Sequence, residues 1–185
     1  DIDAGNIPFS SQPPLGDVVE AYETYRGKEM INISMADGLS GTYQTAVSAR
    51  DMADNQKDIT VINSRTLCGP HRYLVESAAA MAREDKTRGE ILAMLEEKMR
   101  HTKSYLIPQD FDYLRRGGRL SSTAAFVGSV LNLKPVLTPN KECSRLDKFG
   151  IGRTMKGAVK AVFRQMKKDQ VGKEDILYIA HGNVP

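Results

Sequence analysis

A junction at residues 33–43, ISMADGLSGTY, holds the side chains best suited to chemistry. A helix that begins near Ser40 exposes unpaired backbone N–H groups and a partial positive charge. The hydroxyls of Ser40 and Thr42 can donate hydrogen bonds, and Gly41 lets a ligand approach the backbone closely. These properties suit a carboxylate or a phosphate. The same residues also suit a plain helix cap made by Ser40, so both interpretations stay open.

Three other segments carry groups that could meet an anion. FSSQPP at residues 9–14 places hydroxyls, Ser10 among them, before two prolines that stiffen the loop. Arg119 follows paired glycines, and arginine suits bidentate binding of a carboxylate or phosphate. Arg153 lies at a predicted helix start, where the helix dipole disfavours a cation without a nearby anion. Each segment also has a plain interpretation as a surface loop or an exposed arginine.

The sequence lacks the usual signatures of metal sites and hydrolases. Its three histidines and two cysteines show no metal-ligand spacing, and HExxH, GxSxG and GxxxxGK[ST] are all missing. We therefore predict no metal and no cofactor. The alternative function is a serine-dependent acyl-transferase or hydrolase that uses Ser40 as its nucleophile, although no motif places a base near it.

Composition describes a globular chain. Of its 185 residues, 41% are hydrophobic and 26% are charged, which suits one large domain or two small ones. No apolar run approaches the roughly 18 residues that cross a bilayer, and no signal-peptide pattern opens the sequence. Two distant cysteines fit a reducing compartment, with a disulfide as the alternative. We therefore predict a cytoplasmic protein.

Charge is distributed unevenly along the chain. Residues 1–100 hold 11 Lys/Arg against 16 Asp/Glu, whereas residues 101–185 hold 15 against 7. This asymmetry favours two modules and an acidic partner or ligand for one of them, although a solvated basic helix face explains part of it. Nucleic acid is disfavoured because aromatic residues do not alternate with the basic ones and no reader motif is present.

Apolar spacing predicts alternating helices and strands in the first hundred residues. The predicted helices cover residues 17–27, 40–53, 69–85 and 87–101, and the predicted strands cover residues 29–34 and 58–63. This order indicates a parallel sheet with helices on its faces. We predict an α/β fold, with a parallel-sheet α/β domain over residues 1–102 and a smaller α/β domain over residues 103–185.

The pattern changes in the second predicted domain. Strands are expected at residues 103–108, 133–139, 141–149 and 175–182, and helices at residues 109–118, 120–132 and 153–169. The last helix has an apolar stripe that we expect to be core. That stripe consists of Met155, Ala158, Val159, Val162, Phe163 and Met166.

Four motifs occur in a fixed order between residue 9 and about residue 181. They are SSQPP, GLSGTYQTA, FDYLRRGGRLSS with LNLKPVLTP, and RTMKGAVKAV. Together they resemble the DegV family of bacterial lipid-binding proteins. The resemblance implies two α/β domains that bind a long-chain fatty acid in an apolar tunnel, with its carboxylate near the domain interface. It also implies a carrier, not an enzyme, that presents this carboxylate to the catalytic subunit of a fatty-acid kinase.

The resemblance carries over to particular residues. Ser10 and Ser40 match hydroxyls expected to contact the carboxylate, and Gly41 follows within the same motif. Arg119 and Arg153 match arginines expected either near the carboxylate or at the kinase-docking surface, and the sequence does not separate these roles.

The sequence also departs from the family pattern. Ala36 and Asp37 replace serines common in the family, and Asp37 would repel a carboxylate unless it is paired or points away. The family's opening strand and closing histidine segment are missing, and the chain begins with Asp1. We therefore expect a fragment that lacks both ends, which leaves open whether this piece binds lipid alone.

Overall fold

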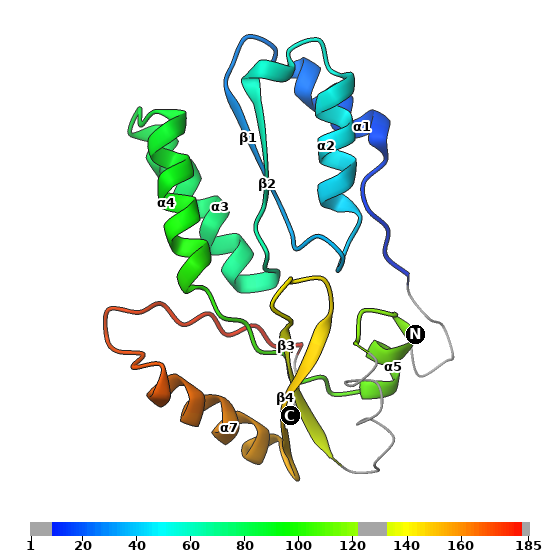
Figure 1. The fold of residues 1–185 in the computed structure, drawn as a ribbon, viewed down its shortest axis with the longest axis vertical. Helices are drawn as coiled ribbons and strands as arrows, with labels where there is room; N and C mark the ends of the chain where they lie inside the picture. Colours follow the sequence, from blue (N-terminus) through cyan, green and yellow to red (C-terminus); the bar gives the residue numbers. More distant parts are fainter. Residues whose placement is uncertain (1–8, 122–132, 183–185) are drawn as a thin grey trace. The chain divides into compact units, whose positions relative to one another are not determined.

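The computed structural model describes residues 9–121 and 133–182 (Figure 1). Contacts within the chain gather in two compact units, Asp1–Asn63 and Ser64–Pro185. The first unit contains α1 (Leu15–Thr24), β1 (Met30–Ser34), α2 (Thr42–Met52), the 3-10 helix η1 (Gln56–Asp58) and β2 (Ile59–Asn63). The second contains α3 (Cys68–Arg83), α4 (Arg88–His101), α5 (Phe111–Arg116), β3 (Lys134–Pro139), β4 (Leu146–Gly152) and α7 (Met155–Lys168). The predicted α/β class is confirmed.

A parallel pair of strands, β1 and β2, forms the centre of the first unit. Its register runs from Met30 opposite Ile59 to Ser34 opposite Asn63. Parallel neighbours need a crossover connection, and α2 supplies it. α1 packs against α2. The buried cluster of this unit consists of Tyr22, Ala49, Ala53 and Ile59. All helices and strands predicted before residue 102 are present, with ends shifted by a few residues.

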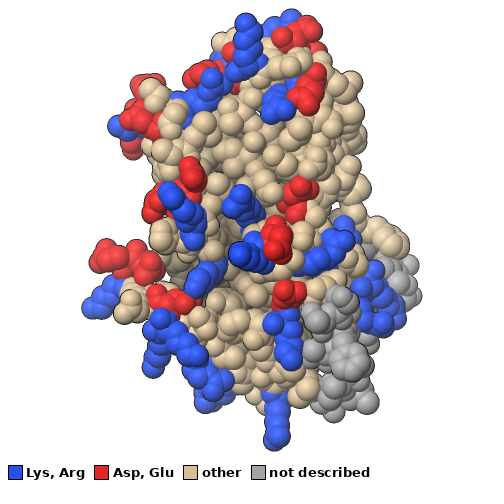
Figure 2. Space-filling view, in the orientation of Figure 1, with Lys and Arg blue, Asp and Glu red and all other residues tan. Residues whose placement is uncertain are grey.

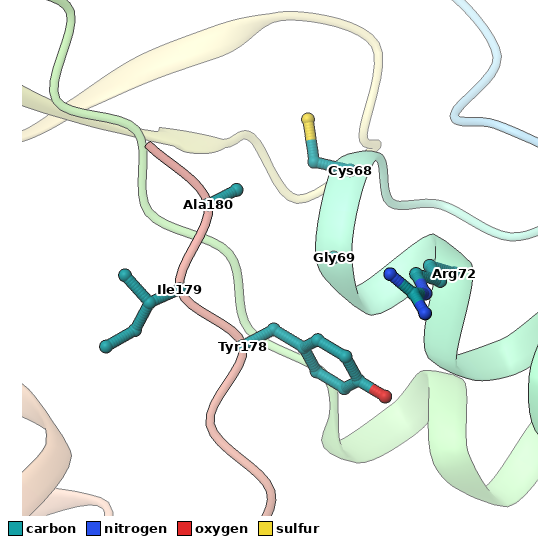
Figure 3. Close-up of a pocket in the computed structure, with 6 residues that line it drawn as sticks. All are labelled: Cys68, Gly69, Arg72, Tyr178, Ile179 and Ala180. Carbon is teal, nitrogen blue, oxygen red and sulfur yellow. The ribbon is translucent and has the colours of Figure 1, made fainter. Parts of the chain in front are cut away.

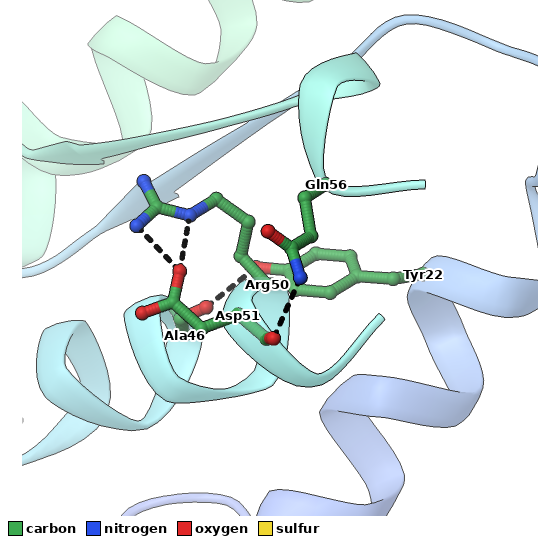
Figure 4. Close-up of polar contacts among 5 residues, drawn as sticks. All are labelled: Tyr22, Ala46, Arg50, Asp51 and Gln56. Carbon is green, nitrogen blue, oxygen red and sulfur yellow. Dashed lines mark hydrogen bonds and ion pairs between the residues drawn. The ribbon is translucent and has the colours of Figure 1, made fainter. Parts of the chain in front are cut away.

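Polar contacts fix α2 against its neighbours (Figure 4). The Tyr22 hydroxyl of α1 donates to the Ala46 carbonyl oxygen at 3.4 Å. Burial raises the pKa of the Tyr22 phenol, so the hydroxyl keeps the proton that it donates. At the other end of α2, Arg50 Nη2 lies 2.7 Å from Asp51 Oδ1, and Gln56 Nε2 donates to the Asp51 carbonyl oxygen at 2.8 Å. α2 is therefore contacted by α1 near its middle and by η1 at its C-terminal end.

Helices α3 and α4 pack on each other at the start of the second unit. α4 begins with a complete capping box, because Thr87 Oγ1 accepts from the Glu90 amide at 3.3 Å and Glu90 Oε2 accepts from the Thr87 amide at 2.9 Å. α3 carries Pro70 in its first turn, where proline is well tolerated. The buried apolar side chains of the two helices are Leu74, Ala78, Ile91 and Leu95.

An antiparallel hairpin of β3 and β4, covered by α7, forms the second sheet. Val136 and Leu137 of β3 are fully buried. Gly152 at the end of β4 permits a close approach of the helix, because a Cβ there would lie 2.3 Å from the Ala158 nitrogen. The strands predicted at residues 133–139 and 141–149 are thus present, although β4 starts only at Leu146.

Two predicted strands are wrong within the described residues. Residues 103–108 make only an isolated bridge, in which the Leu106 and Leu137 backbones exchange hydrogen bonds of 2.9 and 2.8 Å. Residues 175–182 form no strand. A strand exists only through its hydrogen-bonded neighbour, and alternating apolar residues cannot supply one. The helix predicted at residues 120–132 falls almost entirely outside the described residues.

The predicted core stripe of α7 is also partly wrong. Ala158 is fully buried, but Val159 is 36% exposed and Phe163 is 51% exposed. Within the described residues, the sheet that α7 covers has two strands, and so narrow a sheet covers less than the whole apolar stripe. Among the described residues, no helix is both long enough and apolar enough to span a membrane.

Candidate anion-binding site at the start of helix α2

Buried apolar side chains hold the turn between β1 and α2 against the core. Ala36 and Leu39 are buried, and the Leu39 amide donates to the Ala36 carbonyl oxygen at 3.2 Å. Gly38 has φ of +83°, a left-handed conformation that glycine adopts without strain. Asp37 and Ser40 form a bridge across this turn. The position of Ser40 is therefore set by a closed turn rather than by an open loop.

Two hydroxyls meet at the first turn of α2. Ser40 Oγ lies 2.8 Å from Thr42 Oγ1, and it accepts a longer hydrogen bond of 3.3 Å from the Thr42 amide. Only one hydroxyl proton is used between the two oxygens, so the other can be donated to a ligand. Gly41, the N-cap residue, has no side chain to cap the helix. The helix start thus combines a weak cap with an available donor and the positive end of the helix dipole.

The loop at residues 9–14 reaches this helix start through Gln12. A Cβ on Gly41 would overlap the side-chain amide of Gln12, so only glycine leaves room for that amide at this position. Ser10 is exposed on the same loop. Two motifs that lie far apart in the sequence are thereby brought together, which sequence reasoning expected only from the family resemblance.

Asp37 is paired within its own turn and with α2. Its Oδ1 accepts from the Gly38 amide at 3.0 Å, and its Oδ2 accepts from Gln44 Nε2 at 2.8 Å. The Asp37 amide donates to Asn63 Oδ1 at 3.2 Å, which ties the turn to the end of β2. Both carboxylate oxygens therefore have donors. These donors are neutral, so they fix the position of the Asp37 side chain and do not cancel its negative charge.

The predicted arginines belong to the second unit and are exposed. The Arg119 guanidinium donates to the Gly117 carbonyl oxygen, and the Arg119 carbonyl accepts from the Leu146 amide at 2.9 Å. Arg153 does not begin α7 as predicted, because Thr154 is the cap and accepts from the Gly157 amide at 3.1 Å. Arg153 therefore lies outside the helix. Its approach, and that of Arg119, to a carboxylate remains a prediction.

A buried polar cluster in the second unit was missed by sequence reasoning. Ser64 and Thr66 are 1% and 2% exposed. Ser64 Oγ lies 3.0 Å from His71 Nδ1, and Thr66 Oγ1 lies 2.9 Å from Ser104 Oγ. Burial lowers the pKa of the His71 imidazole, which favours its neutral form. His71 is isolated in the sequence but is paired in the fold, because α3 turns it back toward the segment that follows β2.

A shallow cavity of about 250 Å³ lies beside the first turn of α3 (Figure 3). Its lining residues are Cys68, Gly69, Arg72, Tyr178, Ile179 and Ala180. This volume falls below the roughly 300–1,000 Å³ of most small-molecule sites. None of the predicted carboxylate-binding residues lines it, so we do not identify it with the predicted acyl tunnel. Among residues 9–121 and 133–182, no three His, Cys, Asp or Glu side chains could hold a metal ion.

A parallel-sheet α/β unit with a hydroxyl-bearing helix start, followed by a hairpin covered by a helix, matches a known family of proteins. The family model described as "Uncharacterised protein, DegV family" matches residues 2–185. This chain therefore belongs to the DegV family.

Relatives and solved structures place the chain within that family. A DegV domain-containing protein of Clostridium perfringens is 33% identical over 185 residues, covering 97% of this chain and 63% of the relative. The structure of DegV from Bacillus subtilis, named a fatty acid binding protein, has a TM-score of 0.76 at 31% identity and covers 91% of this chain and 60% of that chain. A DegV family protein from Thermus thermophilus, whose structure is named for fatty acid binding, has a TM-score of 0.78 at 28% identity and covers 92% of this chain and 61% of that one. The chain thus spans about three fifths of the length of these proteins.

Proposed function

We propose that this chain is part of a fatty-acid carrier and that it holds the carboxylate of a long-chain fatty acid at the start of α2. The observation that carries the proposal is the Ser40–Thr42 hydroxyl pair, with its 2.8 Å separation, at a helix start that lacks a side-chain cap. The fatty-acid binding named for the B. subtilis and T. thermophilus relatives supports the choice of anion.

The chemistry of a fatty acid suits this arrangement. A carboxylate gains from hydroxyl and backbone N–H donors and from the positive end of a helix. Burial of the acyl chain contributes about 0.8 kcal/mol for each methylene group, so the head-group contacts mainly set orientation. Gly41 leaves room at the helix start, and the side-chain amide of Gln12 occupies that room.

The rest of the proposal concerns the complete protein. Ser10, Arg119 and Arg153 are proposed to complete the surroundings of the carboxylate or to dock a fatty-acid kinase catalytic subunit that phosphorylates it. In this scheme the protein is a cytoplasmic, non-catalytic carrier without a cofactor. Its domains are proposed to divide at residues 1–102 and 103–185.

Native mass spectrometry of the full-length protein, purified from bacteria, tests the proposal. We expect a co-purified fatty acid, and we expect Ser40→Ala to reduce its retention about tenfold or more, because a hydrogen bond to a charged group is worth about 1.5–3 kcal/mol. Ser48→Ala is the matched control, since Ser48 is exposed on the same helix. A wild-type protein that arrives empty and takes up no fatty acid would refute the carrier, and equal retention in Ser40→Ala would refute the carboxylate assignment.

The alternative function, a serine enzyme, has its own test. The hydrogen-bond partners recorded for the Ser40 hydroxyl in the described part of the chain are the hydroxyl and amide of Thr42, and neither is a base that could activate it. Covalent labelling of Ser40 by a fluorophosphonate probe would favour the enzyme. Failure to label, together with fatty-acid retention, would remove it.

A further inference from the structure

Helix α7 presents a stripe of positive charge. Lys156, Lys160, Arg164 and Lys167 are all exposed, and their spacing of three or four residues places them on one side of the helix. We call these four residues the α7 basic face. Residues 155–168 contain no Asp or Glu. In Figure 2, several Lys and Arg side chains lie at the lower left, where α7 lies in Figure 1, with Asp and Glu side chains directly above them.

An apolar edge borders the α7 basic face. At 100° per residue, Phe163 lies beside Lys156 and Lys167, and Val159 lies between Phe163 and the buried face. These two side chains are 51% and 36% exposed. The opposite side of the helix, at Ala158, is fully buried. α7 therefore has a packed side, a basic side and an exposed apolar strip between them.

The cations of the α7 basic face differ from those that the chain pairs with its own carboxylates. Arg26, Arg50, Arg72, Arg100 and Lys103 each form an ion pair within 2.8 Å of a carboxylate oxygen. Across residues 9–121 and 133–182, none of the four α7 cations has an ion pair. The positive charge of this face is thus uncompensated by the chain around it, which makes the face complementary to an anionic surface.

We infer that the α7 basic face docks on the surface of an anionic phospholipid bilayer. A bilayer offers both features that α7 needs, because lipid phosphates meet the Lys and Arg side chains while Phe163 and Val159 enter the interface beneath them. The choice of a bilayer over an acidic protein rests on the proposed function, since a long-chain fatty acid partitions into bilayers and a carrier must collect it there. The contact is peripheral and reversible.

Vesicle co-sedimentation of the full-length protein tests this inference. We expect binding to vesicles of phosphatidylglycerol and phosphatidylcholine, loss of binding at high salt, and no binding to phosphatidylcholine alone. Because each basic residue near an anionic surface contributes about fivefold in affinity, K160Q/R164Q should lower the partition coefficient by more than about tenfold. Phe163→Ser should lower it as well. R83Q/K86Q removes the same charge from exposed positions outside α7 and should leave binding unchanged.

Three outcomes would overturn the inference. The first is a wild-type protein that does not bind anionic vesicles. If such a protein binds poly-glutamate through α7 instead, the partner is an acidic protein. The second is equal loss of binding in K160Q/R164Q and R83Q/K86Q. The third is protection of Lys156, Lys160 and Lys167 from amine acylation in the free protein, which means that another part of the chain covers the face. Fatty-acid retention is measured separately by mass spectrometry, so failure of docking is distinguishable from failure of the carrier proposal.

Discussion

Helices α2 and α7 both pack beside a pair of strands, yet their first turns are chemically different. At α7, Thr154 Oγ1 accepts from the Gly157 amide at 3.1 Å and closes the helix start. At α2, the N-cap is Gly41, and the nearby Ser40 hydroxyl makes only a 3.3 Å contact with the Thr42 amide. A helix start becomes a candidate ligand site when its own sequence leaves donors unused, and the dipole alone does not distinguish the two helices.

The same contrast extends to the glycine beside each helix. Gly152 faces the backbone of α7, where an added Cβ would lie 2.3 Å from the Ala158 nitrogen, whereas Gly41 faces the movable end of the Gln12 side chain. We expect Gly152→Ala to lower the free energy of unfolding by about 3 kcal/mol and Gly41→Ala by less than about 1 kcal/mol. Urea unfolding of both variants measures the difference.

Gly16→Ala is the control for this pair. Gly16 lies in α1 with no atom within 4 Å of an added Cβ, so alanine there should stabilise by about 0.5–1 kcal/mol. Equal losses for Gly152→Ala and Gly41→Ala would contradict the assignment of one glycine to packing and the other to ligand access.

The two helix starts should also separate stability from binding. Thr154→Ala removes a well-formed cap and should cost about 1 kcal/mol of unfolding free energy while leaving fatty-acid retention unchanged. Ser40→Ala should do the reverse, with the smaller loss of stability and the larger loss of retention. Thermal unfolding measures the stability of the two variants, and native mass spectrometry measures their fatty-acid retention. A Thr154→Ala protein that folds but retains no fatty acid would contradict this separation of stability from binding.

The smallest expected effect concerns pH. The three histidines all lie in the second unit, and burial lowers the pKa of His71. The unfolded chain therefore binds more protons at this residue than the folded chain does. The stabilisation is fully present above about pH 6.5, the ordinary histidine pKa, and is lost as the pH falls below it toward the folded value.

His71→Gln should remove that part of the pH dependence, and His101→Gln should keep it, because His101 is exposed on α4. The readout is the difference in urea midpoint between about pH 5 and about pH 7.5. An unchanged pH dependence in His71→Gln would show that other groups cause it.

Local pattern predicted the first hundred residues well because those helices and strands carry their own periodicity and breakers. It failed where the structure of a segment depends on which other segment packs against it. Residues 175–182 have a strand pattern but lack a paired strand in the described part of the chain. Phe163 follows the core period of α7 yet is 51% exposed.

The candidate site shows the same limit. The sequence indicated Ser40 and Gly41 from the chemistry of a helix start. It could not indicate that Gln12 lies against Gly41, or that Gln44 pairs with Asp37, because both contacts depend on how the turn closes. The roles of Arg119 and Arg153 depend on how two units meet, which a motif does not encode.

The paired carboxylate of Asp37 has an evolutionary consequence. The Asp37 carboxylate accepts a hydrogen bond from the Gln44 side chain, and the Asp37 amide donates one to the Asn63 side chain. A change to the serine common in the family would therefore remove the carboxylate that accepts from Gln44. Positions 37 and 44 are therefore expected to substitute together along the lineage, and intermediates that change only one should carry a small fitness cost. An alignment in which aspartate at 37 occurs freely with apolar residues at 44 would argue against this coupling.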